Sequence, residues 1–184
     1  IHQDVKHISR AQEHLNNLET NYNNVTTARV DLSPVFEALK AEMTAEGSAD
    51  QIEMALANTR ARLRMTTLYY YAGLKGFLVV GTGNKVEDFG VGFYTKYGDG
   101  GVDLSPIADL LKSEVYELGQ ALGVPESIMQ APPSDGLWGD ARSDEAHIGA
   151  SYPELEWAMA NKDKGKVASD FNGREQEVFK IFIR

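Results

Sequence analysis

The chain has 184 residues, of which 42% are hydrophobic and 24% charged, and this composition fits one globular domain with its own core. It has no cysteine, which excludes disulfides, a cysteine nucleophile and thiolate metal sites within these residues. Its 27 acidic and 18 basic residues give a net charge of −9, so nucleic acid is an unfavourable partner. No apolar run approaches the ~20 residues that span a bilayer, so we expect no membrane segment.

The amino-terminal part predicts two helices separated by a short strand. Residues 2–18 carry apolar residues at helical spacing, whereas residues 25–30 form a short β-branched run that predicts a strand. A Ser-Pro pair at 33–34 predicts the start of a helix that ends near Met43.

A long helix is predicted over residues 50–71, with Gly73 as its end. At about 100° per residue, Arg60 and Arg64 share one face of this helix and Arg62 points nearly opposite. The three arginines therefore cannot form one clamp around a ligand.

The most informative segment follows this helix. Residues 77–80 read as a buried strand that runs into the turn Gly81-Thr82-Gly83, and a second glycine cluster occupies 98–101. Glycines let the backbone approach a ligand closely, and loops after strands carry the sites of α/β folds. The segment therefore predicts a nucleotide and metal site.

The remaining elements are mostly helical. A second Ser-Pro pair at 105–106 predicts a helix that ends near residue 123, and residues 130–143 read as a loop. Further helices are expected from about residue 143, over 153–160 and over 175–184. Strands that alternate with helices imply an α/β fold with a parallel sheet, but two strands alone do not make a stable sheet. We therefore expect the sheet to be incomplete in this chain.

Several polar side chains in and after the glycine segment have both a functional and a plain interpretation. Thr82 is either a contact to a phosphate or a base, or a plain turn residue. Glu87 is either a Mg²⁺ ligand or a surface carboxylate. Lys96 could supply a positive charge to a phosphate, and Asp103 could orient that lysine or bind a ribose hydroxyl. The alternative is that both are exposed charges that flank a hairpin turn. Lys112, near the positive end of the helix expected from residue 105, suits an anion, or is a surface lysine.

These residues resemble the NAD⁺ synthetase family in order and spacing over roughly residues 50–160. The resemblance is carried by four motifs, which read Ala61-Arg-Leu-Arg-Met65, Val80-Gly-Thr-Gly-Asn84, Phe93-Tyr-Thr-Lys-Tyr-Gly-Asp-Gly-Gly-Val-Asp103 and Ala131-Pro-Pro-Ser-Asp-Gly-Leu-Trp138.

The resemblance implies an ATP-dependent ligase with a Rossmann-like parallel sheet flanked by helices, as in the adenine nucleotide alpha hydrolase-like fold. ATP would adenylylate the nicotinate carboxylate of deamido-NAD⁺ with release of pyrophosphate, and ammonia would then displace AMP to give NAD⁺. The family also implies Mg²⁺, a cytoplasmic location and a homodimer.

The resemblance assigns roles to eight residues of this sequence. The expected ATP contacts are Thr82, Lys112, Ser134 and Gln3; the expected deamido-NAD⁺ contacts are Arg62, Lys96 and Asp103; the expected Mg²⁺ ligand is Glu87. No residue is assigned to covalent catalysis, because the family works by positioning and charge stabilisation.

The chain also departs from the family pattern. The family's Ser-Gly-Gly-x-Asp-Ser phosphate loop and its carboxyl-terminal His-Lys pair are absent from these 184 residues, and one extra residue separates Glu87 from Lys96. We therefore expect residues 1–184 to be a single NAD synthetase domain that continues beyond both ends and is inactive alone. The alternatives are another ATP-pyrophosphatase-type ligase, or a non-catalytic nucleotide-binding module.

Overall fold

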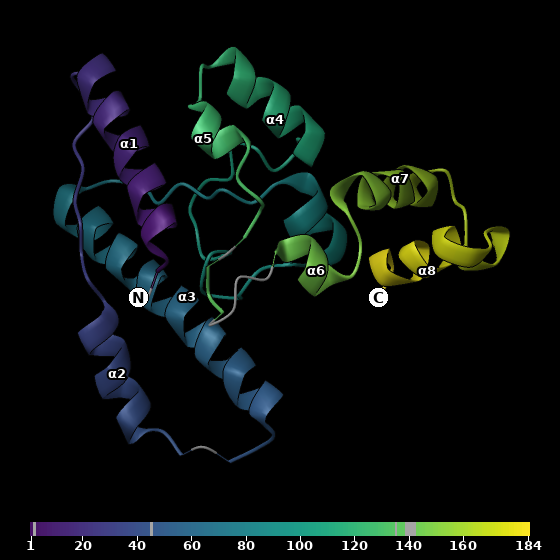
Figure 1. Cartoon of the computed structure of the whole chain (residues 1–184), viewed down its shortest axis with the longest axis horizontal. Coiled ribbons are helices and arrows are strands. Elements are labelled where there is room, and N and C mark those ends of the chain that lie inside the picture. The colour runs from purple at the N-terminus through teal and green to yellow at the C-terminus, as the bar shows by residue number, and fades with distance from the viewer. Residues whose placement is uncertain (2, 45, 135, 139–142) are drawn as a thin grey trace.

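The computed structural model describes residues 1, 3–44, 46–134, 136–138 and 143–184 (Figure 1). Within these residues, helices account for almost all regular structure. They are α1 (Val5–Asn21), α2 (Ser33–Glu42), α3 (Ala49–Lys75), the π-helix η1 (Lys85–Val91), α4 (Lys112–Ala121), α5 (Glu126–Met129), α6 (Asp144–Ile148), α7 (Tyr152–Asp163), the short 3₁₀-helix η2 (Ala168–Asp170) and α8 (Gly173–Phe182). In this described part, each helix is too short or too polar to cross a bilayer.

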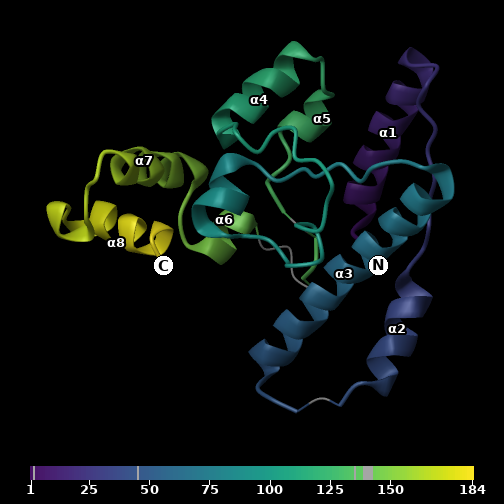
Figure 2. The ribbon, with the colours of Figure 1, turned by 180° about the vertical axis from the view of Figure 1, so that it is seen from behind.

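The helices surround a central group of loops. The long helix α3 runs diagonally past α1 and α2, α4 and α5 lie above the loops, and α7 and α8 extend away from α3 (Figures 1 and 2). The central loops are the two glycine segments and the described residues between α5 and α6. Of the loop predicted over 130–143, positions 135 and 139–142 lie outside the described residues.

The predicted parallel sheet is not present in the described residues. Its trace is one isolated parallel bridge between Val80 and Leu104, supported by the Gly81 N–H donating to the Leu104 carbonyl at 2.7 Å. The segment 25–30 has no strand pairing, so that prediction is wrong. Phe77 and Leu78 are 68% and 63% exposed, whereas a buried strand needs neighbours on both sides. A strand-like sequence thus remains extended without forming a ladder.

Helix α3 is longer than predicted. It begins with a capping box, in which the Ser48 hydroxyl accepts from the Gln51 N–H and the Gln51 side chain accepts from the Ser48 N–H. It passes through Gly73 and ends at Lys75, where Gly76 takes a left-handed conformation with φ of 67°. Gly76, rather than Gly73, is therefore the helix stop.

Gly73→Ala is expected to stabilise the protein by about 0.5–1 kcal/mol, because Gly73 lies in a helix interior and an added Cβ meets no atom within 4 Å. Gly76→Ala is the matched control, and its left-handed backbone predicts a loss of about 1 kcal/mol instead. Urea denaturation of both variants measures the difference. Equal effects from the two substitutions would contradict this account of the helix end.

The helix predicted from Ser105 starts seven residues later. Residues 105–111 form hydrogen-bonded turns, with the Ala108 N–H donating to the Ser105 carbonyl at 3.2 Å. Helix α4 begins at Lys112, and the Glu114 carboxylate accepts from the Leu111 N–H at 2.7 Å at its start. Lys112 is therefore the first residue of α4 and not part of a second turn.

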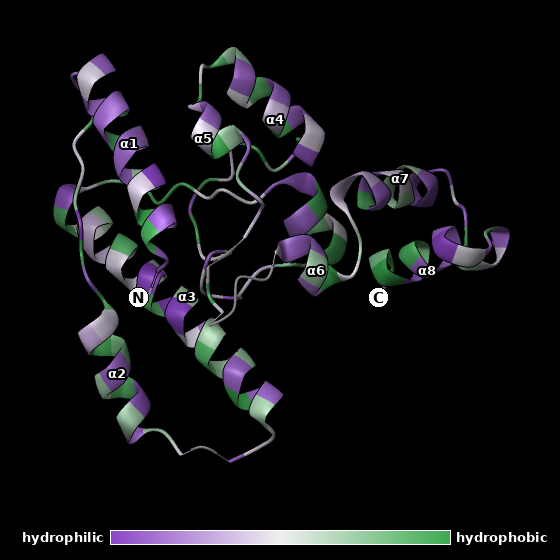
Figure 3. Ribbon diagram, in the orientation of Figure 1, coloured by the Kyte–Doolittle hydropathy of each residue, from purple (hydrophilic) through white to green (hydrophobic). Residues whose placement is uncertain are grey.

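The main hydrophobic core lies where α7, α8 and η1 meet. Its buried members are Val86, Ala150, Tyr152, Leu155, Ala158, Met159, Val178, Phe179 and Phe182. The C-terminal half of α8 is correspondingly hydrophobic (Figure 3). A smaller cluster joins Ala57 and Ala61 of α3 to Leu137 and Trp138. The first core fixes one side of the central loops and the second fixes the other.

Candidate functional site

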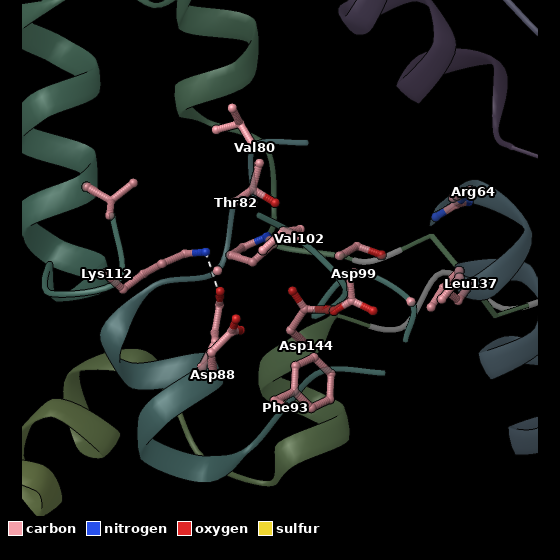
Figure 4. A pocket seen from close by; sticks show the side chains of 18 of the residues that line it. Arg64, Val80, Thr82, Asp88, Phe93, Asp99, Val102, Lys112, Leu137 and Asp144 are labelled. Carbon is pink, nitrogen blue, oxygen red and sulfur yellow. Dashed lines mark hydrogen bonds and ion pairs between the residues drawn. The ribbon is translucent and has the colours of Figure 1, made fainter. Parts of the chain in front are cut away.

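A cavity of about 720 Å³ opens among the central loops. It is bounded by the turn 81–83, the second glycine segment, one face of α3, the start of α4, residues 131–134, Leu137 and Asp144 (Figure 4). A cavity of this size, lined by apolar surface and a few convergent polar groups, has the dimensions of a small-molecule site.

The turn at 81–83 forms one wall, and its glycine is required by a close neighbour. Thr82 is exposed at the cavity, and a Cβ on Gly83 would lie 1.8 Å from Oδ2 of Asp88. Only glycine lets the Asp88 carboxylate pack against this turn. The turn therefore brings backbone and an acidic side chain together at the cavity.

The π-helix η1 presents two consecutive carboxylates, Glu87 and Asp88, to the cavity. The buried Asn84 caps η1, its side-chain oxygen accepting from the N–H groups of Val86 at 3.0 Å and Glu87 at 3.1 Å. A π-helix takes up one more residue per turn than an α-helix and is frequent at functional sites.

Glu87 is held by three donors from α4, from α7 and from the N-cap of η1. Lys112 Nζ lies 2.7 Å from Oε1, the Tyr152 hydroxyl donates to the same oxygen, and Asn84 Nδ2 donates to Oε2. Burial, followed by the hydrogen bond to Glu87, raises the pKa of Tyr152, so its phenol stays protonated and donates. A carboxylate has about four lone-pair positions, so one on Oε2 is left for a cation.

Negative charge accumulates on the wall beside Glu87. Burial raises the pKa of Asp88 to about 6, and the charges of Asp99 and Glu87 add to the effect. Asp144 lines the same cavity (Figure 4). Among the described residues, no three acidic or histidine side chains could enclose a metal by themselves. A single Glu87 oxygen fits Mg²⁺, which takes one or two carboxylates and completes its octahedron with phosphate oxygens and water.

Ser134 and Gln3 meet on another wall. Ser134 lines the main cavity and, with Gln3, a smaller side cavity of about 290 Å³ next to α1. The Gly136 N–H donates to Ser134 Oγ at 3.3 Å, and Gln3 Nε2 donates to the Gly136 carbonyl at 2.7 Å. Two residues that are 131 positions apart in sequence therefore border one space.

The arginines of α3 divide as the helical spacing predicts. Arg60 and Arg64 both donate toward residues 136–137, Arg60 to the Leu137 carbonyl at 2.9 Å and Arg64 to the Gly136 carbonyl at 3.5 Å. Arg62 instead donates to the Lys96 carbonyl at 3.1 Å. The expected opposition of Arg62 to the other two is confirmed.

Arg62, Lys96 and Asp103 are exposed and are not part of the cavity lining. Asp103 accepts from the Val79 N–H at 2.8 Å and from the Tyr69 hydroxyl at 3.1 Å. In this arrangement Asp103 fixes the strand-like segment to α3. The structure thus brings Thr82, Glu87, Lys112 and Ser134 around one cavity and leaves these three residues outside it.

The NAD synthase family model matches residues 2–182. The chain belongs to the NAD synthase family. It is 40% identical over 156 residues to the NH(3)-dependent NAD(+) synthetase of Carboxydothermus hydrogenoformans, a match covering 85% of this chain and 63% of the relative. It is 44% identical over 160 residues to that of Methanococcoides burtonii, covering 84% of this chain and 59% of the relative. The chain therefore spans about 60% of the length of these relatives, and the family expectation is confirmed.

Solved structures agree with this assignment. The chain superposes on an NMN synthetase from Francisella tularensis with a TM-score of 0.79 at 30% identity, covering 98% of this chain and 68% of that one. For the NAD⁺ synthetase from Burkholderia pseudomallei the TM-score is 0.56 at 30% identity, covering 84% of this chain and 56% of that one. The arrangement of helices and loops is thus that of NAD synthase family members.

Within this NAD synthase family chain, the structure adds site residues to which the sequence analysis assigned no role. Asp88, Asp144 and Arg64 line the cavity, and Tyr152 binds Glu87 from 65 positions away. No local spacing connects Tyr152 with Glu87, because the contact depends on how α7 packs on η1. Asp88 could have been found as the sequence neighbour of Glu87.

Proposed function

We propose that the protein is an ammonia-dependent NAD⁺ synthetase. ATP adenylylates the nicotinate carboxylate of deamido-NAD⁺, pyrophosphate leaves, and ammonia displaces AMP. The observation that supports this most is the convergence of Thr82, Glu87, Lys112 and Ser134 on one cavity in a chain of the NAD synthase family. As part of the proposal, residues 1–184 belong to one NAD synthetase domain of a cytoplasmic homodimer, and the Val80–Leu104 bridge is a parallel pairing of its adenine nucleotide alpha hydrolase-like sheet.

The cavity residues would act by positioning ATP and neutralising its charge. Thr82 and the turn around it offer a hydroxyl and close backbone to the nucleotide, and Lys112 offers a point charge at the first residue of α4, where the helix N-terminus also favours anions. Ser134, with Gln3 beside it, would contact the nucleotide from another wall. Glu87 Oε2 would hold Mg²⁺ together with phosphate oxygens; when bound, Mg²⁺ neutralises charge on those oxygens.

The dinucleotide acid would extend out of the cavity. Arg62, Lys96 and Asp103 are exposed, Arg62 donates to the Lys96 carbonyl, and these three side chains would receive deamido-NAD⁺. Exposed residues of this kind are also where a homodimer partner would close the site. The logic of the reaction is electrostatic, since a carboxylate is a poor acyl donor until adenylylation bonds one of its oxygens to phosphorus; ammonia then attacks the carbon, and that oxygen leaves as part of AMP.

A second candidate is amidation of a mononucleotide acid to NMN. It is favoured by the TM-score of 0.79 with the Francisella tularensis NMN synthetase, against 0.56 for the Burkholderia pseudomallei NAD⁺ synthetase at the same 30% identity. The curated relatives at 40–44% identity, which are NAD⁺ synthetases, support deamido-NAD⁺.

The experiment that separates these functions supplies the full-length protein with ATP, Mg²⁺, ammonium and one acid at a time. We expect NAD⁺, AMP and pyrophosphate in equal amounts from deamido-NAD⁺, with a higher kcat/KM than for nicotinate mononucleotide. The reverse preference would establish the second candidate. AMP and pyrophosphate formed without either acid would reject both, and ATP binding without turnover would indicate a non-catalytic module.

Glu87→Gln is expected to lower kcat/KM for MgATP by about 100-fold while changing the free energy of unfolding by less than about 1.5 kcal/mol. Glutamine keeps the shape but removes the charge that faces Lys112 and the proposed cation. Glu117→Gln on the exposed side of α4 is the matched control. Unchanged activity of the Glu87 variant at limiting Mg²⁺ would reject the metal role.

A further inference from the structure

Tyr152 connects the main hydrophobic core to the cavity. It is the first residue of α7, is 5% exposed, and is a buried member of the core formed by α7, α8 and η1. Its hydroxyl leaves this core and donates to Glu87 Oε1. Because packing in the core fixes the tyrosine ring, the hydrogen bond from its hydroxyl restricts the movement of the Glu87 carboxylate.

The same tyrosine contacts both members of the Lys112–Glu87 ion pair. Lys112 Nζ lies 4.6 Å from the centroid of the Tyr152 ring and 2.7 Å from Glu87 Oε1. The ring thus attracts the ammonium while the hydroxyl binds the carboxylate. On the other side, Asn84 donates to Glu87 Oε2, so donors hold both carboxylate oxygens and restrict rotation of the group.

The position of the Tyr152 hydroxyl is itself fixed by the start of α7. The Tyr152 N–H donates to Glu145 Oε1 at 2.9 Å, and Ser151 and Glu154 form a capping box with the Ser151 N–H donating to Glu154 Oε2 at 2.8 Å. Arg174 of α8 donates to the same Glu154 carboxylate at 2.8 and 2.9 Å. These contacts leave the phenol little freedom to move away from Glu87.

We propose that Tyr152 is a positioning residue for the amidation reaction, which holds Glu87 and Lys112 so that Glu87 Oε2 faces the cation and Lys112 faces the phosphates of bound ATP. This inference rests on the proposed function. Tyr152 touches neither substrate in the proposal; it acts through Glu87, which faces the cation, and through Lys112, which faces the phosphates.

Tyr152→Phe tests the proposal, because it removes the hydroxyl and keeps the ring that packs in the core and under Lys112. We expect kcat to fall about 10- to 100-fold, the size of effect seen when the partners of a metal ligand are removed. The Mg²⁺ concentration for half-maximal ATP binding, measured by calorimetry without any acid substrate, should rise at least fivefold. The melting temperature should stay within a few degrees of the natural protein.

Tyr70→Phe is the matched control, since Tyr70 is 65% exposed and lies away from the cavity lining. Tyr152→Leu, which also removes the ring, should lose activity at least as severely and melt lower. If Tyr152→Phe keeps the Mg²⁺ dependence of ATP binding and the kcat of the natural protein, the positioning role is wrong. If it lowers only the melting temperature, the hydroxyl is merely structural, and the proposal is overturned as well.

The calorimetric measurement separates this inference from the proposed function. A natural protein that binds MgATP but amidates neither nicotinate acid would remove the proposed reaction. The effect of Tyr152→Phe on Mg²⁺-dependent ATP binding would still decide whether Tyr152 positions Glu87.

Discussion

Lys112→Met is expected to lower kcat/KM for ATP by about 10²- to 10³-fold, the range found when one preorganised charge-stabilising group is removed from an active site. Lys112 is suited to stabilising the phosphate charge, because it is positively charged, lies at the cavity and is held in place by Glu87. It is the first residue of α4, its side chain is 18% exposed, and its Nζ points into the cavity beside Glu87 (Figure 4). Methionine keeps the length and the apolar stem, so packing against the Tyr152 ring is largely retained.

The matched control is Lys166→Met, which removes the same charge from an exposed lysine outside the cavity lining. The double variant Glu87→Gln/Lys112→Met should lose much less than the product of the two single losses, because the two side chains act as one ion pair. Activity is measured with saturating acid substrate and varied ATP. A loss below threefold in the single Lys112 variant would show that this lysine does not face the phosphates.

Most helices of this fold could be predicted from local sequence signals, whereas the pairing of strands could not. The spacing of apolar residues and the Ser33-Pro34 pair located α1, α2 and most of α3, because these signals act within a few residues. The Ser-Pro pair at 105–106 predicted a helix start that is wrong, because the residues after it form turns and α4 begins at Lys112. The strand at 77–80 failed for a different reason: pairing needs a neighbour, and among the described residues Val80 pairs only with Leu104.

In the candidate site, residues that are close in sequence could be predicted, whereas contacts between residues distant in sequence could not. Thr82, Glu87 and Lys112 lie within 30 positions of one another, so motif spacing was enough to group them, and the structure places all three on the cavity. The contact of Tyr152 with Glu87 could not be predicted from motif spacing, because the two residues are 65 positions apart. The roles of Arg62, Lys96 and Asp103 remain predictions, since these residues are exposed and lie outside the cavity lining.

Phe179→Ala is expected to destabilise the protein by about 3–5 kcal/mol, the usual cost of truncating a fully buried phenylalanine. Phe179 is 1% exposed in the main core, and its ring centroid lies 5.1 Å from that of Phe171. Removing the ring leaves a cavity between α7 and α8 that surrounding side chains fill only partly. Chemical denaturation followed by circular dichroism measures the loss, and Phe89→Ala, at a 65% exposed position, should change stability by less than about 0.5 kcal/mol.

Tyr152 belongs to the same buried cluster as Phe179, so unfolding of this core should also remove the contact that holds Glu87. We therefore expect the Phe179 variant to lose activity in parallel with folded protein as temperature rises, while at low temperature the folded fraction retains its KM for ATP. A raised KM at a temperature where the variant is fully folded would mean that the cavity next to Phe179 already lets α7 shift. A stability loss below about 1 kcal/mol would contradict the packing itself, because no side chain held by so loose a core could fix Glu87.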